Sequence, residues 1–293
     1  IDKPSVSRTL RTYLELAKLR IVTLLLFTTL TTMIVAARGI PPLAILLPTL
    51  IGGALSAMGA SVINQYYDRD MDAKMNRTAR RPIPSGRVAP VNALIFGLAL
   101  LVWSTLILWL FVNPLSALLA LGGAIYYVII YTVRPKGNTG VHILIGGGAG
   151  AMPVLVGWAA VTGTLSYEAL ILFAVVFYWT PPHSWALALL VNSDYARANV
   201  PMMPVARGEE VTRRQILLYA VQLFIVSLMP ALFGFMGGIY LISALLLGLG
   251  LIREAVILLR RKDGASARKA YKFSTAYLAF LFMAMMVDVL LLG

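Results

Sequence analysis

The sequence contains no cysteine and few charged side chains. Its 293 residues include two histidines and only 13% charged residues, against roughly 25% in an ordinary soluble domain. Without cysteine there are no disulfides, no thiolate ligands for a metal or heme, and no cysteine nucleophile. The scarcity of charge, beside 59% hydrophobic residues, indicates that lipid surrounds most of the chain.

Nine apolar segments of membrane-spanning length run through the chain. Lipid offers no hydrogen-bond partners, so only helices and closed barrels cross it, and runs of about 20 apolar residues are typical of helices. The first run follows basic residues as a signal peptide does, but its length predicts a span. The prediction is one all-α integral membrane domain over residues 1–293, with spans around a central cavity at 20–37, 43–66, 91–112, 115–133, 140–161, 166–190, 215–235, 238–259 and 273–292.

The basic residues are distributed unevenly around these spans. All but one of the 25 Lys and Arg residues precede the first span, lie in alternate connections or, as Arg20 and Arg253 do, lie in a span toward the same side; the exception is Arg38. By the positive-inside rule, this pattern predicts a cytoplasmic N-terminus and an outside C-terminus in the cell inner (plasma) membrane. The formal charge of +13 does not indicate nucleic acid, because basic residues separated by apolar runs do not form one face of a soluble fold. Membrane lipid is the expected surrounding partner.

An acidic motif ends the second span. Asn64, Asp68 and Asp72 recur every four residues, which places them on one face of a helix while Asp70 points elsewhere. Two stacked carboxylates repel each other unless a cation joins them, and hard oxygen ligands completed by substrate phosphates are the usual way to hold Mg²⁺. The alternative is a solvated, charged helix end. The spacing favours a magnesium-diphosphate site, because a solubilising end does not need its charges on one face.

A basic segment follows the acids directly. Arg77, Arg80 and Arg81 can clamp phosphate oxygens beside a metal site and stabilise a departing diphosphate. The segment from Tyr131 to Lys136, in the next inside connection, can supply further contacts. The alternative for these cations is attraction to anionic lipid headgroups, worth about 1 kcal/mol per basic residue. For Arg87, lipid contact alone is the expected role.

A third polar group lies in the sixth predicted span and the connection after it. Pro181 and Pro182 predict an early break in this span, and His183 follows them directly. A histidine at membrane depth is costly without a role, and its imidazole can ligate iron or pair with a carboxylate. The alternative is a histidine that caps the carbonyls freed by the prolines. Asp194 opens the following connection, where it is expected to face the acidic motif across a cavity.

On these residues the chain resembles the UbiA-type intramembrane prenyltransferases. The resemblance covers nearly the whole chain, through the nine spans and the Asn-x-x-x-Asp-x-x-x-Asp element at 64–72, which marks the superfamily. The heme-farnesylating branch is indicated by Trp-Thr-Pro-Pro-His-x-Trp-Ala-Leu at 179–187, with Asp194-Tyr195 and Val200-Pro201-Met202. The stretch Arg-Thr-x-x-Arg-Pro-x-x-x-Gly at 77–86 agrees with it. Quinone-type relatives carry a second Asp-x-x-x-Asp element, whereas here Ala198 stands four residues after Asp194.

The resemblance implies a role for each candidate residue. Magnesium and the diphosphate of farnesyl diphosphate are held by Asn64, Asp68 and Asp72, with Asp194 as a further catalytic acid. Heme B contacts His183, Trp179 and Tyr195. The diphosphate contacts Arg77, Arg80, Arg81, Lys136 and Tyr131.

The implied reaction transfers the farnesyl group to a vinyl group of heme B, and water addition then gives heme O and diphosphate. A downstream heme-modifying enzyme or oxidase assembly would receive the product. Two other readings compete with this one. The first is a related enzyme acting on an aromatic quinone precursor. The second is a secondary transporter, although the acids cluster at one membrane face and no inverted repeat is seen.

Overall fold

The computed structural model describes residues 6–133 and 142–292, and these residues are helical without strands. Eight of the described helices are long and apolar enough to cross a membrane, and a shorter apolar helix makes the ninth. The predicted nine-span, all-α fold is thus confirmed. The eight are α2 (Leu19–Ala37), α3 (Leu43–Asp72), α4 (Pro90–Phe111), α6 (His142–Thr162), α7 (Tyr167–Leu190), α10 (Glu209–Leu232), α11 (Gly238–Arg261) and α12 (Gly264–Leu292).

The ninth span changes helix type along its length. It begins as α5 (Pro114–Ile125) and continues as the π-helix η1 (Tyr126–Val133). Asn113 caps its start by accepting a hydrogen bond from the Ser116 N–H at 2.8 Å. A π-helix is uncommon and is frequently found at functional sites. Because η1 contacts α3, which carries the acidic motif, its residues are candidates for the site.

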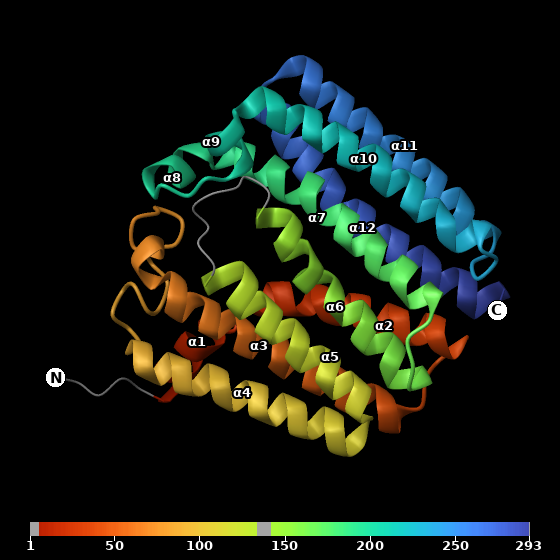
Figure 1. Cartoon of the computed structure of the whole chain (residues 1–293), viewed down its shortest axis with the longest axis horizontal. Coiled ribbons are helices and arrows are strands. Elements are labelled where there is room, and N and C mark those ends of the chain that lie inside the picture. The colour runs from red at the N-terminus through yellow and green to blue at the C-terminus, as the bar shows by residue number, and fades with distance from the viewer. Residues whose placement is uncertain (1–5, 134–141, 293) are drawn as a thin grey trace.

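The contacts between the spans form a closed ring in which sequence neighbours pack together, and Figure 1 shows the spans from the side. Each of α2 to α7 contacts the next span, α7 contacts α10, and the series continues through α11 to α12. Helix α12 then packs against both α7 and α2, which closes the ring. Three short helices complete the chain: α1 (Val6–Leu16), α8 (Asn192–Arg197) and α9 (Met203–Arg207). Figure 1 shows α8, α9 and the connection after α3 at one end of the molecule, away from the C-terminus.

Several helices extend beyond the predicted spans. Helix α3 continues to Asp72 rather than ending near 66, α10 begins at Glu209 rather than 215, and α12 begins at Gly264 rather than 273. Hydropathy marks where a chain enters lipid, whereas backbone hydrogen bonding continues into the headgroup region. The start of α12 is fixed by a cap, because the Asp263 carboxylate accepts a hydrogen bond from the Ser266 N–H at 2.7 Å.

The expected early break of the sixth span is wrong. Helix α7 runs unbroken from Tyr167 to Leu190 with Pro181 and Pro182 inside it, and both prolines are buried. Proline removes a helical hydrogen bond, but neighbouring helices in a membrane protein hold such a segment in place. Here Trp179 donates its indole N–H to the Ser274 carbonyl of α12 at 2.6 Å, which fixes α7 just before the prolines.

Close packing between helices relies on glycine. A Cβ atom on Gly59 of α3 would lie 2.8 Å from the carbonyl oxygen of Gly97 on α4, and one on Gly157 of α6 would lie 2.6 Å from the Thr29 carbonyl of α2. Small residues allow helix backbones to approach in this way when no hydrophobic effect drives association in lipid. The Gly59 contact fixes α4 against α3 five residues before Asn64.

Helix α1 was not predicted, and it packs beside the end of α3. Leu16 is fully buried, and its carbonyl accepts a hydrogen bond from the Gln65 side chain at 2.6 Å. A small apolar cluster joins α1, α3, α4 and the connection after α3; its buried members are Leu16, Val62, Ile83, Val88 and Ala93. The N-terminal segment is therefore part of the packed structure around the acidic motif.

Candidate functional site

The candidate site lies at the end of α3, where the acidic motif forms one wall of a cavity of about 210 Å³. Asn64, Asp68 and Asp72 all line it, and the Asn64 amide donates a hydrogen bond to Asp68 at 2.9 Å. The Asp70 side chain is 85% exposed and lies 3.9 Å from Arg69. The four-residue spacing therefore separates the motif residues from Asp70, as a helix requires.

The position of these acids is electrostatically unfavourable for the helix alone. The C-terminal end of a helix carries partial negative charge, and carboxylates in its last turns are destabilising there. Asp72 is the last residue of α3, and its side chain is only 3% exposed. Arg81 offsets this charge by donating a hydrogen bond to Asp72 Oδ2 at 2.6 Å. A buried acid at a helix C-terminus, matched by a cation, favours a site for positive ligands over a solubilising end.

The connection after α3 folds back over the helix end and presents its cations to the cavity. The Thr78 hydroxyl donates to the Asp72 carbonyl at 2.9 Å, and the Arg81 N–H donates to the Thr78 carbonyl at 2.9 Å. Arg77 and Arg81 both line the cavity. Arg80 has an exposed side chain and is not among the described residues that line it.

Two residues at the site were missed by the sequence interpretation. Lys18, at the junction of α1 and α2, donates a hydrogen bond to Asn64 Oδ1 at 3.2 Å, and its φ of 50° is left-handed, which is uncommon outside glycine. Tyr127 comes from the π-helix η1 and lines the same cavity. A lysine before a first span, such as Lys18, is typical of positive-inside charge. A tyrosine near a helix end, such as Tyr127, is typical of the membrane interface. Only the π-helix, which sequence does not reveal, singles out Tyr127.

The opposite wall is built by α7, α8 and the chain between α8 and α9; its lining residues are Ser184, Leu187, Tyr195, Val200 and Met202. Burial raises the pKa of the Tyr195 phenol, while Arg77 and Arg81 act to lower it. The phenol therefore remains protonated at neutral pH and can donate a hydrogen bond. Asp194 accepts a hydrogen bond from Arg197 at 3.2 Å and is not among the described residues that line the cavity. Its role as a further acid stays a prediction.

A second cavity, also of about 210 Å³, lies beside the first. Lys18 and Tyr127 line both cavities, so they stand at the junction. Beyond them the walls are small or apolar side chains of α2, α3, α5 and α6, including Leu25, Ala60 and Pro153. A polar, cation-rich chamber thus adjoins an apolar chamber among the spans.

Trp179 and His183 lie on the face of α7 that packs against α12. His183 Nδ1 shares a hydrogen bond with the Ser274 hydroxyl at 2.9 Å. Its ring stacks on Trp179 with centroids 4.3 Å apart and lies 4.7 Å from the ring of Tyr271. Nδ1 therefore pairs with a neighbouring helix and does not cap a carbonyl of α7. Ser184, the next residue, lines the polar cavity.

The third predicted cationic group falls largely outside the described residues. Tyr131 belongs to η1 in its backbone, but its side chain is outside the description, and Lys136 lies outside the described residues altogether. Both stay predictions.

The donor set fits a hard divalent cation that shares its ligands with phosphate. Two carboxylates and an amide lie together on α3, while the described residues contain no group of three or more His, Asp or Glu side chains able to hold a metal. An all-protein cage is therefore not present there. Mg²⁺ is commonly bound by one or two carboxylates with water and substrate phosphates completing its shell, and the nearby cations suit a phosphate ligand.

Comparison with known proteins identifies the class. Residues 25–285 match the UbiA prenyltransferase family, and the chain belongs to that family. It is 50% identical over 292 residues to a protoheme IX farnesyltransferase of Chloroflexus aurantiacus, covering 100% of this chain and 50% of the relative. A protoheme IX farnesyltransferase of Symbiobacterium thermophilum is 49% identical over 290 residues, covering 98% of this chain and 97% of the relative. The chain spans about half the length of the first of these relatives and nearly all of the second.

Solved structures share the fold at low sequence identity. A digeranylgeranylglyceryl phosphate synthase superposes with a TM-score of 0.80 at 20% identity, covering 96% of this chain and 98% of the other. A UbiA homologue from Archaeoglobus fulgidus, bound to DMAPP and Mg²⁺, superposes with a TM-score of 0.67 at 19% identity, covering 94% and 99%. The nine-span ring is therefore the shared architecture.

Proposed function

We propose that this chain transfers the farnesyl group of farnesyl diphosphate to a vinyl group of heme B, with addition of water, giving heme O and diphosphate. The observation that carries the proposal is the meeting, at Lys18 and Tyr127, of a chamber lined by acids and arginines with an apolar chamber among the spans. A prenyl diphosphate has the same two parts. The choice of heme as acceptor rests on relatives of about 50% identity that are named protoheme IX farnesyltransferases.

In the proposed complex the diphosphate occupies the polar chamber. Asn64, Asp68 and Asp72 would hold Mg²⁺, which would neutralise charge on the leaving group when bound there. Arg77, Arg81 and Lys18 line this chamber and would contact the phosphate oxygens directly. Arg81 pairs with Asp72 at 2.6 Å, so binding of the metal to Asp72 would release its guanidinium toward the diphosphate.

Farnesyl transfer then needs no protein nucleophile. The bond between C1 and oxygen breaks, the diphosphate leaves with the electron pair, and an allylic cation remains. The chain's contribution is to fix cations where negative charge develops and to exclude water from the prenyl chain. The heme vinyl group attacks C1, which forms the new carbon–carbon bond. Water adds to the resulting heme-side cation and loses a proton, which balances the reaction.

We assign heme contact to the region of Trp179, His183 and Tyr195. Tyr195 lines the polar chamber, and the α7 face that carries Ser184 and Leu187 continues its wall. His183 sits one residue before Ser184 in an aromatic setting, which suits an axial ligand or a partner for a propionate. The chain is a multi-pass membrane protein, and we place this chemistry on the cytoplasmic side of the plasma membrane.

A product assay tests the proposal. Membranes containing the protein are incubated with farnesyl diphosphate, Mg²⁺ and heme B, and the extracted hemes are analysed by mass spectrometry. The expected product has gained one farnesyl group and one hydroxyl group. If the heme is unchanged and an aromatic quinone precursor is prenylated instead, that precursor is the acceptor substrate. Substrate flux without diphosphate release would instead favour a transporter.

A further inference from the structure

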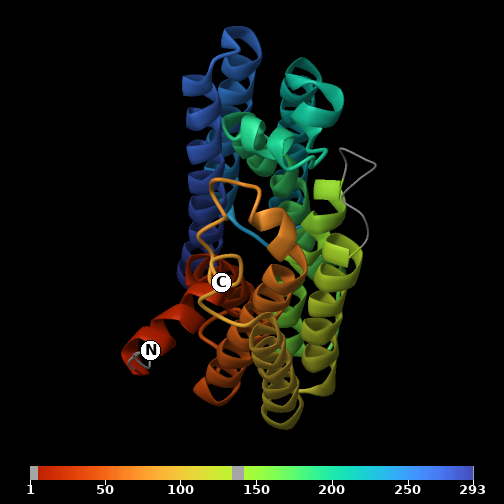
Figure 2. The same ribbon diagram turned by 90° about the vertical axis from the view of Figure 1, so that its left-hand side faces the viewer.

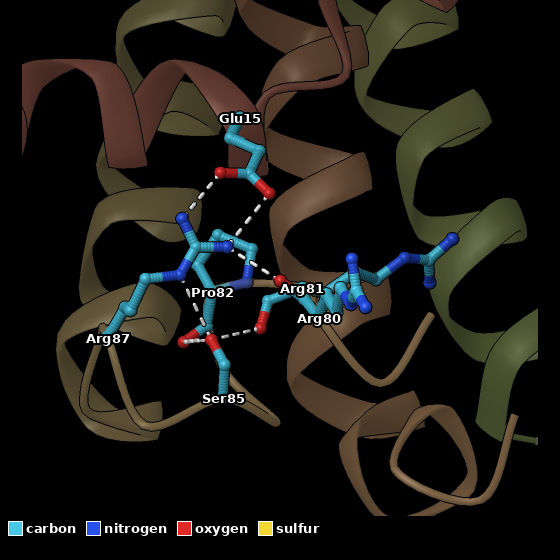
Figure 3. Close-up of polar contacts among 6 residues, drawn as sticks. All are labelled: Glu15, Arg80, Arg81, Pro82, Ser85 and Arg87. Carbon is cyan, nitrogen blue, oxygen red and sulfur yellow. Dashed lines mark hydrogen bonds and ion pairs between the residues drawn. The ribbon is translucent and has the colours of Figure 1, made fainter. Parts of the chain in front are cut away.

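Arg87 stands at the centre of a hydrogen-bond network that joins α1 to the connection after α3 (Figure 3). Its guanidinium forms a two-pronged ion pair with Glu15 of α1, with Nη1 to Oε2 at 2.7 Å and Nη2 to Oε1 at 2.9 Å. Nη2 also donates to the Arg80 carbonyl at 2.6 Å, and Nε donates to the Ser85 hydroxyl at 3.0 Å. The expected role of Arg87 in lipid contact alone is wrong, because its donors are engaged within the protein.

This network reaches Arg81 through the backbone. The Ser85 hydroxyl, held by Arg87, donates to the Arg81 carbonyl at 2.7 Å, and the Ser85 N–H donates to the same carbonyl at 3.0 Å. Arg87 therefore contacts the carbonyl of Arg80 directly and that of Arg81 through Ser85. The Arg81 side chain leaves this anchored backbone to pair with Asp72 at 2.6 Å. Two atoms of one guanidinium, Nη2 and Nε, thus fix the peptide from which a candidate diphosphate ligand extends.

The other partner, Glu15, is itself held firmly. The next residue, Leu16, is fully buried, and its carbonyl accepts the Gln65 side chain of α3. Gln65 directly follows Asn64 in the acidic motif. Glu15 therefore lies at a helix end that is hydrogen-bonded to α3. Through Arg87, the connection after α3 is held to this same end of α1.

The exposure of the pair indicates what it contributes. The side chains of Arg87 and Glu15 are 42% and 47% exposed, and exposed ion pairs contribute little to global stability. A planar fork that satisfies two carboxylate oxygens and two further acceptors instead specifies geometry. The network is better suited to hold a loop in one conformation than to hold the fold together.

We propose that Arg87 is a positioning residue for diphosphate binding: with Glu15, it locks the connection 73–89 so that Arg77 and Arg81 face the acidic motif. The inference rests on the proposed function, because it takes the polar chamber to be the diphosphate site. In this proposal, α1 carries Glu15 and thereby anchors Arg87 and the connection 73–89.

The test measures binding of inorganic diphosphate in the presence of Mg²⁺ to purified full-length protein, by competition with a labelled prenyl diphosphate. The variants are Arg87→Gln, Glu15→Gln, the double variant and Arg87→Lys. Glu210→Gln is the matched control, since Glu210 forms an exposed ion pair with Lys262 at 3.1 Å at a similar exposure of 41%. Melting temperature and heme affinity are recorded for every variant.

We expect Arg87→Gln and Glu15→Gln each to weaken diphosphate binding by about tenfold, a coupling of the size that interacting neighbours show. The double variant should match a single variant, because both changes remove the same lock. Arg87→Lys should recover only part, since lysine keeps the charge but lacks the fork. Glu210→Gln should bind diphosphate as the wild type does, and heme affinity should stay unchanged in every variant. Melting temperature should fall only by the small amount that an exposed ion pair contributes.

Three results overturn the lock. Unchanged diphosphate binding in a stable Arg87→Gln protein does so directly. Equal loss of heme and diphosphate affinity would indicate general destabilisation, and additive losses in the double variant would show that the two side chains act separately. Failure of the wild-type protein to bind diphosphate would count against the proposed function itself, which separates the two claims.

Discussion

At the scale of single residues, the site is organised by how each charge is compensated. Asp72 is buried at the negative end of α3 and paired with Arg81, whereas Asp70, two residues earlier, is exposed. Removing one partner of a buried pair leaves an uncompensated charge and is strongly destabilising. Burying Asp72 and Asn64 is therefore destabilising for the helix alone, and a bound cationic ligand would offset this destabilisation.

His183 gives a prediction that separates the two substrates. His183→Ala removes the hydrogen bond to Ser274 and the imidazole that we assign to heme. We expect weaker heme binding and less product, with Mg²⁺-dependent farnesyl diphosphate binding nearly intact. Soret titration measures the first and a competition assay the second, on protein of unchanged melting temperature. Unaltered heme affinity in the stable variant would remove His183 from the heme site.

The Glu15–Arg87 pair gives a prediction about pH. The Arg87 guanidinium, through its hydrogen bond to Glu15, lowers the pKa of that carboxyl below its ordinary value. A lowered folded-state pKa adds stability that is present above the unfolded pKa and is lost as pH falls through the folded one. The difference in melting temperature between wild type and Glu15→Gln should thus be constant through neutral pH and shrink only in acid. A difference that vanishes near neutral pH would contradict the assignment.

At the scale of helices, close packing places the motif. Gly59→Ala adds a Cβ atom 2.8 Å from the Gly97 carbonyl, a contact that backbone must move to relieve. Overpacking costs about 1–3 kcal/mol, whereas alanine in an open helical position gains about 1 kcal/mol over glycine. Gly122→Ala in α5 is the control, because nothing lies within 4 Å of its added atom.

We expect Gly59→Ala to lower the melting temperature and weaken diphosphate binding, and Gly122→Ala to leave both unchanged or raise stability. Thermal unfolding in detergent, with the competition assay, measures the two effects. Equal behaviour of the two variants would mean that the α3–α4 contact does not position the motif.

The sequence predicted the spans well because lipid imposes a simple rule on length and hydropathy. It predicted the acidic face because four-residue spacing has one meaning on a helix. It failed for Lys18 and Tyr127, since each reaches the site from a different helix and no local pattern records that meeting. It failed for α7 because Pro181 and Pro182 are tolerated through contacts with α12, which a single segment does not show.

At the scale of the whole molecule, the fold places polar chemistry at one end of the ring. The connection after α3 and helices α8 and α9 lie together there, and Figure 2 shows them from the side that faces that end. The polar cavity is lined from both. The polar cavity and its cations thus lie at one end of the molecule, while the apolar chamber lies among the spans.

The predicted orientation of the spans rests on the distribution of basic residues and can be tested directly, since the chain has no cysteine. Single cysteines at Asn76 and Ala265, both exposed, should react with an impermeant thiol reagent only from the cytoplasmic side. Cysteine at exposed Thr164, between α6 and α7, should react only from outside. Labelling of Asn76 and Ala265 from opposite sides would contradict the nine-span topology.

The proposed metal-diphosphate site on α3 is tested by measuring diphosphate release in Asp68→Asn and Asp70→Asn proteins supplied with farnesyl diphosphate, heme B and Mg²⁺. The two substitutions remove the same charge two residues apart, but only Asp68 lines the cavity. We expect Asp68→Asn to abolish diphosphate release and heme alkylation, and Asp70→Asn to retain both near the wild-type rate. Equal loss in the two variants, or full release by Asp68→Asn, would contradict a metal-diphosphate site on this face of α3.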